Sequence, residues 1–185
     1  MGVANVTYDL CPDVTISEIV RQTRAAVVCA TRNAEAMGCD PQRIILMGHS
    51  AGGHLAAMGA LTDWSMFGLP ANALKGVVPI SGIFDLEPMA LTDSQAHIRL
   101  SDSEVRWQSP LRVLRKVETQ CLTVWGGDEL SGYVEQSREF TAAWREAGNL
   151  GETLVVTGKH HFDVMDELMS PHSAVVSATF KMAIR

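Results

Sequence analysis

The sequence predicts an α/β fold with a mostly parallel β-sheet and helices on both of its faces. Four apolar segments have the length of buried strands and are bounded by glycine or proline, at residues 43–47, 76–80, 121–125 and 153–156. Helical stretches separate these segments, and strands that alternate with helices are typical of a parallel sheet. A length of 185 residues, with 46% hydrophobic residues, is sufficient for one domain with its own core.

The elements follow one another in a simple order. Residues 3–8 are a short β-rich run, so we expect a first strand there. Thr15 and Glu18 have the spacing of a capping box, and the apolar spacing that follows predicts a helix over residues 16–37 that ends at Gly38. Further helices are expected at residues 54–61, near 110–117, at 134–147 and after residue 162.

A G-x-S-x-G motif occupies residues 48–52, directly after one predicted strand and directly before a helix. This arrangement is the nucleophile elbow, which predicts the α/β-hydrolase fold and a strained backbone at Ser50 that exposes its hydroxyl. We expect glycine at Gly48 and Gly52 because a Cβ at either position would collide with the neighbouring strand and helix. The backbone N–H of Ala51 is then placed to stabilise an oxyanion.

A serine hydroxyl needs a base, and in this fold an acid and then a histidine follow the serine in the chain. His160 and His161 both follow the last predicted strand. Two adjacent histidines cannot both face the serine. We favour His161 because the ring of its neighbour Phe162 can anchor the start of the last helix.

The acid belongs just after the strand at residues 121–125, where Asp128 and Glu129 are adjacent. Acids in this fold commonly lie three residues after the glycine that ends the strand. Counting from Gly126 selects Glu129, with Asp128 as the alternative acid.

Residues 84–116 are too long for a simple crossover between two strands and are expected to form a cap insertion over the pocket. Its apolar side chains either line an apolar acyl or aryl subsite or only pack the cap onto the body. These residues are Leu86, Met89, Leu91 and Trp107. We assign Trp107 to substrate binding. His49 has the same assignment, against the alternative that it is a packed, hydrogen-bonded histidine.

Composition restricts the class of partner. The formal charge of −6 is spread along the chain without a basic patch, which argues against nucleic acid and membrane partners and leaves a small-molecule substrate. No metal-ligand spacing occurs, so neither a metal nor another cofactor is expected. The absence of a long apolar run and of a leader pattern predicts a soluble, cytoplasmic protein.

The sequence resembles the kynurenine formamidase (arylformamidase) and carboxylesterase branch of the α/β-hydrolases over nearly the whole chain. The shared motifs, in order, are Tyr-Asp-Leu-Cys-Pro at 8–12, Gly-His-Ser-Ala-Gly-Gly-His-Leu at 48–55, Ser-Gly-Ile-Phe-Asp-Leu at 81–86, Ser-Pro-Leu at 109–111, Gln-Ser at 136–137 and His-Phe at 161–162. In that branch the acid lies seven residues before the glutamine of the Gln-Ser pair. The resemblance therefore also implies Glu129.

The resemblance implies a serine hydrolase that cleaves a carboxylic ester or a formamide through an acyl-enzyme. The favoured substrate is an N-formyl aryl amine such as N-formylkynurenine, with a short-chain carboxylesterase as the alternative. A non-catalytic, truncated hydrolase that acts as a binding module is an alternative of another class.

One family motif is absent from this sequence. In the family, a His-Gly-Gly motif upstream of the Tyr-Asp-Leu-Cys-Pro segment donates the second oxyanion N–H, and these 185 residues contain no such motif. We therefore expect the functional protein to have further strands upstream. We expect the 185 residues alone to be weakly active and to self-associate as homo-oligomers.

Overall fold

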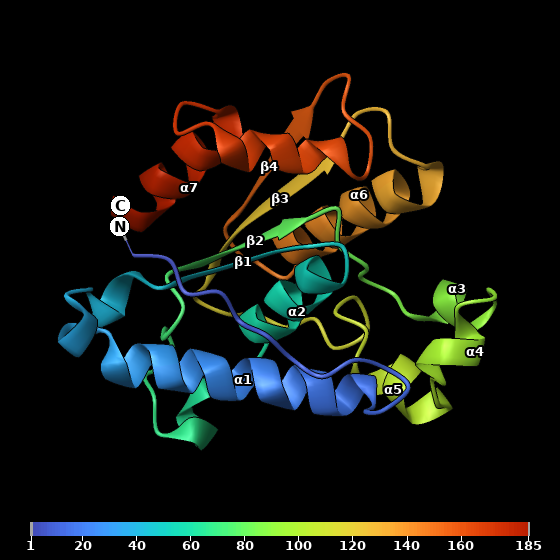
Figure 1. The fold of residues 1–185 in the computed structure, drawn as a ribbon, viewed down its shortest axis with the longest axis horizontal. Helices are drawn as coiled ribbons and strands as arrows, with labels where there is room; N and C mark the ends of the chain where they lie inside the picture. Colours follow the sequence, from blue (N-terminus) through green and yellow to red (C-terminus); the bar gives the residue numbers. More distant parts are fainter. Residues whose placement is uncertain (1, 185) are drawn as a thin grey trace.

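A four-stranded parallel sheet forms the centre of the computed structural model, which describes residues 2–184 (Figure 1). Its strands stand in chain order and are β1 (Ile45–His49), β2 (Gly76–Ile80), β3 (Gln120–Gly126) and β4 (Gly151–Val156). Ile80 pairs with His49 of β1 and with Val124 of β3, so the carboxyl ends of neighbouring strands lie together. The predicted parallel sheet is confirmed.

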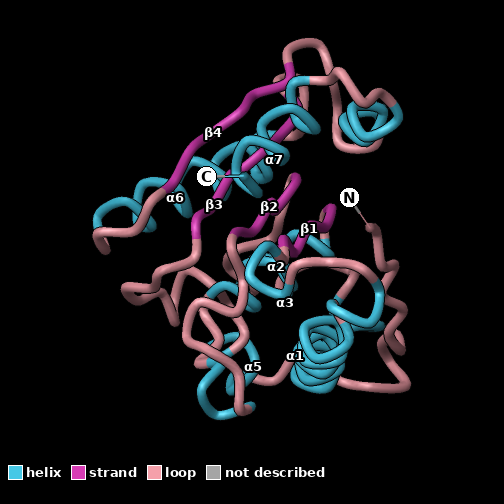
Figure 2. Tube along the Cα trace, turned by 90° about the vertical axis from the view of Figure 1, so that its left-hand side faces the viewer, coloured by secondary structure: helices cyan, strands magenta, loops and turns pink. Residues whose placement is uncertain are grey.

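Helices cover both faces of the sheet, as the sequence predicts. On one face, α2 (Ala51–Ala60) and α6 (Ser131–Glu146) share a core cluster with the strands, and α7 (Ala174–Ile184) packs on the other face (Figure 1). A third cluster joins α2 to α1 (Ile16–Asn33), which lies beyond α2, away from the strands (Figure 2). This layered arrangement buries both faces of the central strands, and all five residues of β2 are buried.

Several short helices connect the main elements. Three of them lie between β2 and β3, namely α3 (Glu87–Ala90), α4 (Gln95–Ile98) and α5 (Asp102–Trp107). The remaining short elements are 3₁₀ helices, at η1 (Glu35–Met37), η2 (Pro41–Arg43), η3 (Trp64–Phe67) and η4 (Asp163–Met169). Among residues 2–184, no helix combines the length and the apolar character that crossing a membrane requires.

The expected strand at residues 3–8 is wrong. These residues are irregular, and Figure 1 shows the segment that contains them running beside α1. Val3 and Val6 are exposed, while Tyr8 packs against the cluster between α1 and α2. A β-rich sequence forms a strand only where a neighbouring strand takes up its backbone hydrogen bonds. Within the described residues, the segment has no such neighbour.

The expected helix near residues 110–117 is also wrong. The segment makes a turn and then runs irregularly to β3. Its backbone is held from outside, because the Asn149 side chain accepts from the Val117 N–H at 2.8 Å and donates to the Arg115 carbonyl at 2.9 Å. Leu111 and Val113 pack against the core, so tertiary contacts replace the helical hydrogen bonds.

Other helix boundaries shift by a few residues. The Thr15 hydroxyl caps α1 by accepting from the Glu18 N–H, and α1 ends at Asn33, four residues before the expected end. The 3₁₀ turn η1 follows it, and Gly38 closes that turn with a left-handed φ of 71°. The helix expected at 134–147 starts earlier, at Ser131. After residue 162, η4 precedes the final helix α7.

Candidate active site

Ser50 stands at the turn between β1 and α2. Its φ of 54° and ψ of −114° place a non-glycine residue in a sparsely populated backbone region. The turn is held from both sides, since the Ser50 N–H donates to the Ile80 carbonyl at 2.9 Å and the Ser50 carbonyl accepts from the His54 N–H at 3.1 Å. The side chain therefore projects from a fixed and strained elbow at the carboxyl end of the sheet.

Of the two glycines of the elbow, Gly48 meets the expectation of a close approach and Gly52 does not. A Cβ at Gly48 would lie 2.3 Å from the Gly52 carbonyl oxygen, so Gly48 is required by close approach. A Cβ at Gly52 would meet nothing within 4 Å, and the expected collision at that position is wrong. The crowded position is the next one, because a Cβ at Gly53 would lie 2.7 Å from the Gly82 Cα. Close packing of α2 against the end of β2 thus depends on Gly53.

His161 faces Ser50 across the end of the sheet. Its Nε2 lies 3.1 Å from the Ser50 Oγ, and its side chain is 15% exposed. The neighbouring His160 is exposed and turns to Asp163, whose carboxylate accepts from the His160 backbone N–H at 2.6 Å. Of the two adjacent histidines, His161 is therefore the one that meets the serine.

Glu129 completes a continuous hydrogen-bonded chain. Its Oε2 lies 3.0 Å from the His161 Nδ1, and its side chain is fully buried. Its Oε1 accepts from the Gly126 N–H at 2.7 Å and from the Ser81 hydroxyl. Three donors therefore surround a carboxylate whose burial would otherwise be costly. Asp128 is exposed, and its backbone N–H donates to the Lys159 carbonyl.

Two further rings pack around the His161 imidazole. The Tyr133 ring, from the first turn of α6, stacks on it with ring centroids 4.1 Å apart. The His49 ring lies at 4.5 Å, and the His49 Nε2 is 2.7 Å from the His161 carbonyl oxygen. Burial lowers the pKa of His49, which favours the neutral ring. The structure thus places His49 beside the base loop, and its assignment to substrate binding stays a prediction.

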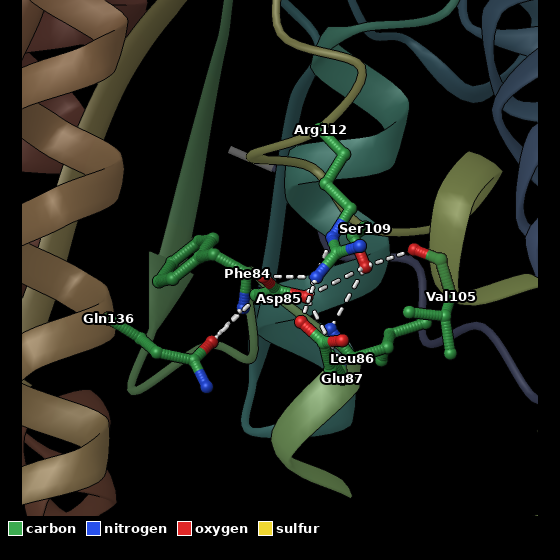
Figure 3. Close-up of polar contacts among 8 residues, drawn as sticks. All are labelled: Phe84, Asp85, Leu86, Glu87, Val105, Ser109, Arg112 and Gln136. Atoms are coloured by element: carbon green, nitrogen blue, oxygen red, sulfur yellow. Dashed lines mark hydrogen bonds and ion pairs between the residues drawn. The ribbon is translucent and has the colours of Figure 1, made fainter. Parts of the chain in front are cut away.

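A polar network ties the two ends of the segment between β2 and β3 together (Figure 3). Arg112 donates to both carboxylate oxygens of Asp85 at 3.0 Å, and the Ser109 hydroxyl accepts from the Leu86 N–H at 2.9 Å. Burial opposes ionisation of Asp85, but the hydrogen bonds and charge of Arg112, together with the hydrogen bonds from the Glu87 N–H and the Ser109 hydroxyl, outweigh burial and lower the pKa of that carboxyl. The Gln136 side chain of α6 accepts from the Phe84 and Asp85 N–H groups at 2.7 and 2.8 Å.

The same segment is anchored to α1 and α2. The buried Glu104 of α5 accepts from the Ser17 N–H at 3.0 Å and from the Ser17 hydroxyl at 3.2 Å. The buried His54 of α2 places its Nε2 2.6 Å from the Gln108 carbonyl oxygen. Burial lowers the pKa of His54 to about 4, so the neutral ring donates this hydrogen bond. The segment predicted to be a cap is therefore attached to three helices of the body.

The apolar residues proposed for a substrate subsite lie in different environments. Leu86 is 5% exposed, whereas Leu91 is 85% and Trp107 is 59% exposed. The Arg106 guanidinium lies over the Trp107 ring at 5.3 Å. The expected anchoring by Phe162 is wrong, because its side chain is 77% exposed and its ring meets the His161 ring edge-on.

Sequence reasoning missed Ser81 and Tyr133. The signal for Ser81 is a Ser-Gly pair directly after a predicted strand, within one of the motifs that this sequence shares with the family it resembles. Tyr133 had no signal in the sequence, because its contact with His161 depends on where α6 begins. Ala51 is the first residue of α2, where backbone N–H groups have no partner within the helix.

The parallel sheet and the strained serine between a strand and a helix define an α/β-hydrolase, and the hydrogen-bonded order of serine, histidine and glutamate fits that class. The chain belongs to the BD-FAE family, whose family model matches residues 1–119. The matched range includes Ser50 and ends before Glu129 and His161.

Comparison with known proteins gives relatives that are named hydrolases. The chain is 27% identical to a kynurenine formamidase of Danio rerio, over 97% of this chain and 61% of that protein. It is 25% identical to an isoprenylcysteine alpha-carbonyl methylesterase of Arabidopsis thaliana, over 88% of this chain and 43% of that protein. A solved structure of a candidate thioesterase from Silicibacter sp. TM1040 is 31% identical, with a TM-score of 0.79, over 94% of this chain and 62% of that one. The chain thus spans about three fifths or less of the length of these relatives.

Proposed function

We propose that this chain is the catalytic part of a serine hydrolase that cleaves a formamide or a carboxylic ester through an acyl-enzyme. The observation that carries the proposal is the hydrogen-bonded chain from Ser50 through His161 to Glu129. A serine hydroxyl is a weak nucleophile, and a histidine base oriented by a buried carboxylate is the arrangement that activates it. A protein without catalytic activity would not require a serine, a histidine and a carboxylate hydrogen-bonded in this order.

The mechanism follows from the positions of these atoms. The Ser50 Oγ attacks the substrate carbonyl carbon while its proton passes to the His161 Nε2. The Nδ1–H of the resulting imidazolium donates to the Glu129 Oε2, which stabilises the positive charge. The Ala51 N–H is the donor available to the oxyanion at the start of α2. His161 then returns its proton to the leaving amine or alcohol as the carbon–nitrogen or carbon–oxygen bond breaks.

Water completes the reaction. His161 removes a proton from the water, whose oxygen attacks the acyl carbon, and the acid product leaves as the Ser50 hydroxyl is restored. For an N-formyl aryl amine the products are the aryl amine and formate. No cofactor is needed in this sequence of steps.

We favour an N-formyl aryl amine such as N-formylkynurenine as substrate. Two exposed apolar side chains adjoin the acid and the base, Leu130 and Phe162, each 77% exposed. Exposed apolar side chains next to the acid and the base suit an aryl group, and several relatives are named kynurenine formamidases. A short-chain carboxylesterase is the second candidate, favoured by the relatives named methylesterases. A cytoplasmic location remains part of the proposal.

The deciding experiment compares turnover of N-formylkynurenine and of a short-chain aryl ester by the same preparation. A higher kcat/KM for the formamide supports the favoured substrate, and a higher value for the ester supports the second candidate. A fluorophosphonate probe tests the mechanism separately, with Ser50→Ala as control. If the folded chain turned over neither substrate and Ser50 stayed unlabelled, the proposal would be wrong, and a non-catalytic binding module would be favoured.

A further inference from the structure

Ser81 directly follows β2, just as Ser50 directly follows β1. It therefore lies between the strand that leads to Ser50 and the strand that leads to Glu129. Its backbone N–H donates to the Val124 carbonyl of β3 at 2.8 Å. The residue is completely buried. Each of the four strands is thus followed at its carboxyl end by a member of one cluster: Ser50, Ser81, Glu129 and His161.

The backbone of Ser81 is strained. Its φ is 47°, a left-handed value that glycine adopts freely and that a residue with a Cβ adopts at a cost. Within residues 2–184, only Ser50 and Arg99 share this property among non-glycine residues. Glycine would adopt this φ at lower cost than serine. The presence of serine here therefore indicates a role for its side chain.

The Ser81 hydroxyl has a defined partner, the Oε1 of Glu129. The same oxygen accepts from the Gly126 N–H at 2.7 Å, while the other oxygen, Oε2, meets the His161 Nδ1 at 3.0 Å. A carboxylate rotates about its last bond, so two donors on one oxygen fix which oxygen remains for the histidine. Of these two donors, the Ser81 hydroxyl belongs to a side chain and the Gly126 N–H belongs to the backbone.

The loop that begins with Ser81 is itself held against α6, the helix that follows Glu129. The Gln136 side-chain oxygen accepts from the backbone N–H groups of Phe84 and Asp85, as Figure 3 shows. The two segments that meet at the carboxylate are therefore joined at a second point. This second connection helps to hold the Ser81 hydroxyl and the Glu129 carboxylate in fixed positions relative to each other.

We propose that Ser81 is a positioning residue, whose hydroxyl holds the Oε1 of Glu129 so that the Oε2 stays aimed at the Nδ1 of His161. The inference rests on the proposed function for the role of His161 as a base. It adds a fourth member to the chain of Ser50, His161 and Glu129. It also gives a role to the serine of the Ser-Gly pair after β2, which the proposed mechanism does not use.

The test uses Ser81→Ala and Ser81→Gly in the full chain, with Ser137→Ala as the matched control. Ser137 is also a completely buried serine, but its hydroxyl has no hydrogen-bond partner among the described residues. Thermal unfolding first establishes that each variant folds. Turnover of the better of the two substrates and the rate of fluorophosphonate labelling at Ser50 are then measured.

We expect both Ser81 variants to lose kcat by roughly 10- to 100-fold, the equivalent of one hydrogen bond to a charged group, with little change in KM. Ser137→Ala should match the parent chain. Ser81→Gly is the decisive variant, because it removes the backbone strain together with the hydroxyl. A Ser81→Gly variant with the activity of the parent chain would overturn the proposal, and so would a loss confined to KM.

A second measurement does not depend on turnover. An imidazole N–H shared with a carboxylate gives a low-field proton signal, here from the His161 Nδ1–H. We expect Ser81→Ala to shift this signal or to speed its exchange with water, and Ser137→Ala to leave it in place. An unchanged signal in Ser81→Ala would contradict the positioning role. Failure of Ser50 to react with the probe in the parent chain would instead contradict the proposed function.

Discussion

The Nε2 of His161 lies 3.1 Å from the Oγ of Ser50, although 111 positions separate the two residues in the chain. The parallel sheet makes this contact possible, because every strand runs in the same direction and the loops after β1 and β4 emerge at the same end. Glu129 and Ser81 enter from the two strands between them. The geometry therefore depends on the order of the strands and little on distance along the sequence.

Substitution of either member of this pair should abolish turnover. We expect Ser50→Ala and His161→Ala each to lower kcat by roughly 10³-fold or more, and the double variant to be no worse than either single one, because nucleophile and base act as a unit. His160→Ala is the matched control, since His160 is exposed and bonds to Asp163. A larger loss in His160→Ala than in His161→Ala would reassign the base.

Substituting each of the two adjacent carboxylates in turn tests which one acts as the acid. Glu129→Gln should lower kcat by roughly 10²- to 10⁴-fold, because the amide neither fixes the His161 tautomer nor balances the imidazolium charge. Asp128→Asn should have a small effect, because Asp128 is exposed and, within residues 2–184, only its backbone N–H forms a hydrogen bond, to the Lys159 carbonyl. Steady-state kinetics on one substrate are sufficient. The reverse ranking would move the acid to Asp128.

The parts of this site that could be predicted depend on local pattern. The elbow has a fixed spacing around Ser50, and the order of serine, acid and histidine leaves few candidates for Glu129 and His161. The four strands can be predicted because each is an apolar run with clear ends. These features are properties of short stretches of sequence, so sequence reasoning is strong there.

The parts that could not be predicted depend on contacts between distant segments. Residues 3–8 have the composition of a strand and no neighbouring strand in the described structure, while Asn149 holds residues 115–117 out of a helix. The role of Ser81 requires knowing that β2 lies between β1 and β3. Likewise, the sequence suggests that the Phe162 ring anchors the start of the last helix, but the residue is exposed in the structure.

The polar network of Figure 3 should contribute measurably to stability. Ser109 is completely buried, and its hydroxyl accepts from the Leu86 N–H and donates to the Val105 carbonyl at 2.6 Å. Ser109→Ala leaves both backbone groups without these partners, so the free energy of unfolding should fall by about 1–3 kcal/mol in urea titrations. Ser137→Ala removes a buried hydroxyl that has no hydrogen-bond partner within residues 2–184, so it should change the free energy of unfolding little. Equal losses in the two variants would argue against the network.

The edge of the sheet at β1 should favour self-association. Within residues 2–184, β1 pairs with β2 only, and its five residues are partly exposed. Unpaired backbone groups on an edge strand pair readily with another chain. We expect the weight-average mass in sedimentation equilibrium to rise with concentration. A mass equal to one chain at every concentration would contradict this expectation.

The stability of the protein should depend on pH through His54. Burial lowers the pKa of His54 in the folded state to about 4, from an ordinary value near 6.5 in the unfolded chain. Between these values the unfolded chain binds the proton more tightly, so the free energy of unfolding must fall as the pH drops through that window. The full loss, reached near pH 4, is about 3 kcal/mol, and above pH 6.5 His54 contributes no pH dependence.

The matched variant for this prediction is His54→Gln, whose neutral amide retains a donor for the Gln108 carbonyl but cannot take up a proton. Urea unfolding of both chains between pH 4 and pH 7.5 separates the contribution of His54 from that of the carboxylates, which both chains share. The difference in unfolding free energy between parent and variant should be constant above pH 6.5 and should shift in favour of the variant as the pH falls. A difference that stays constant over the whole range would show that His54 is not buried in its neutral form.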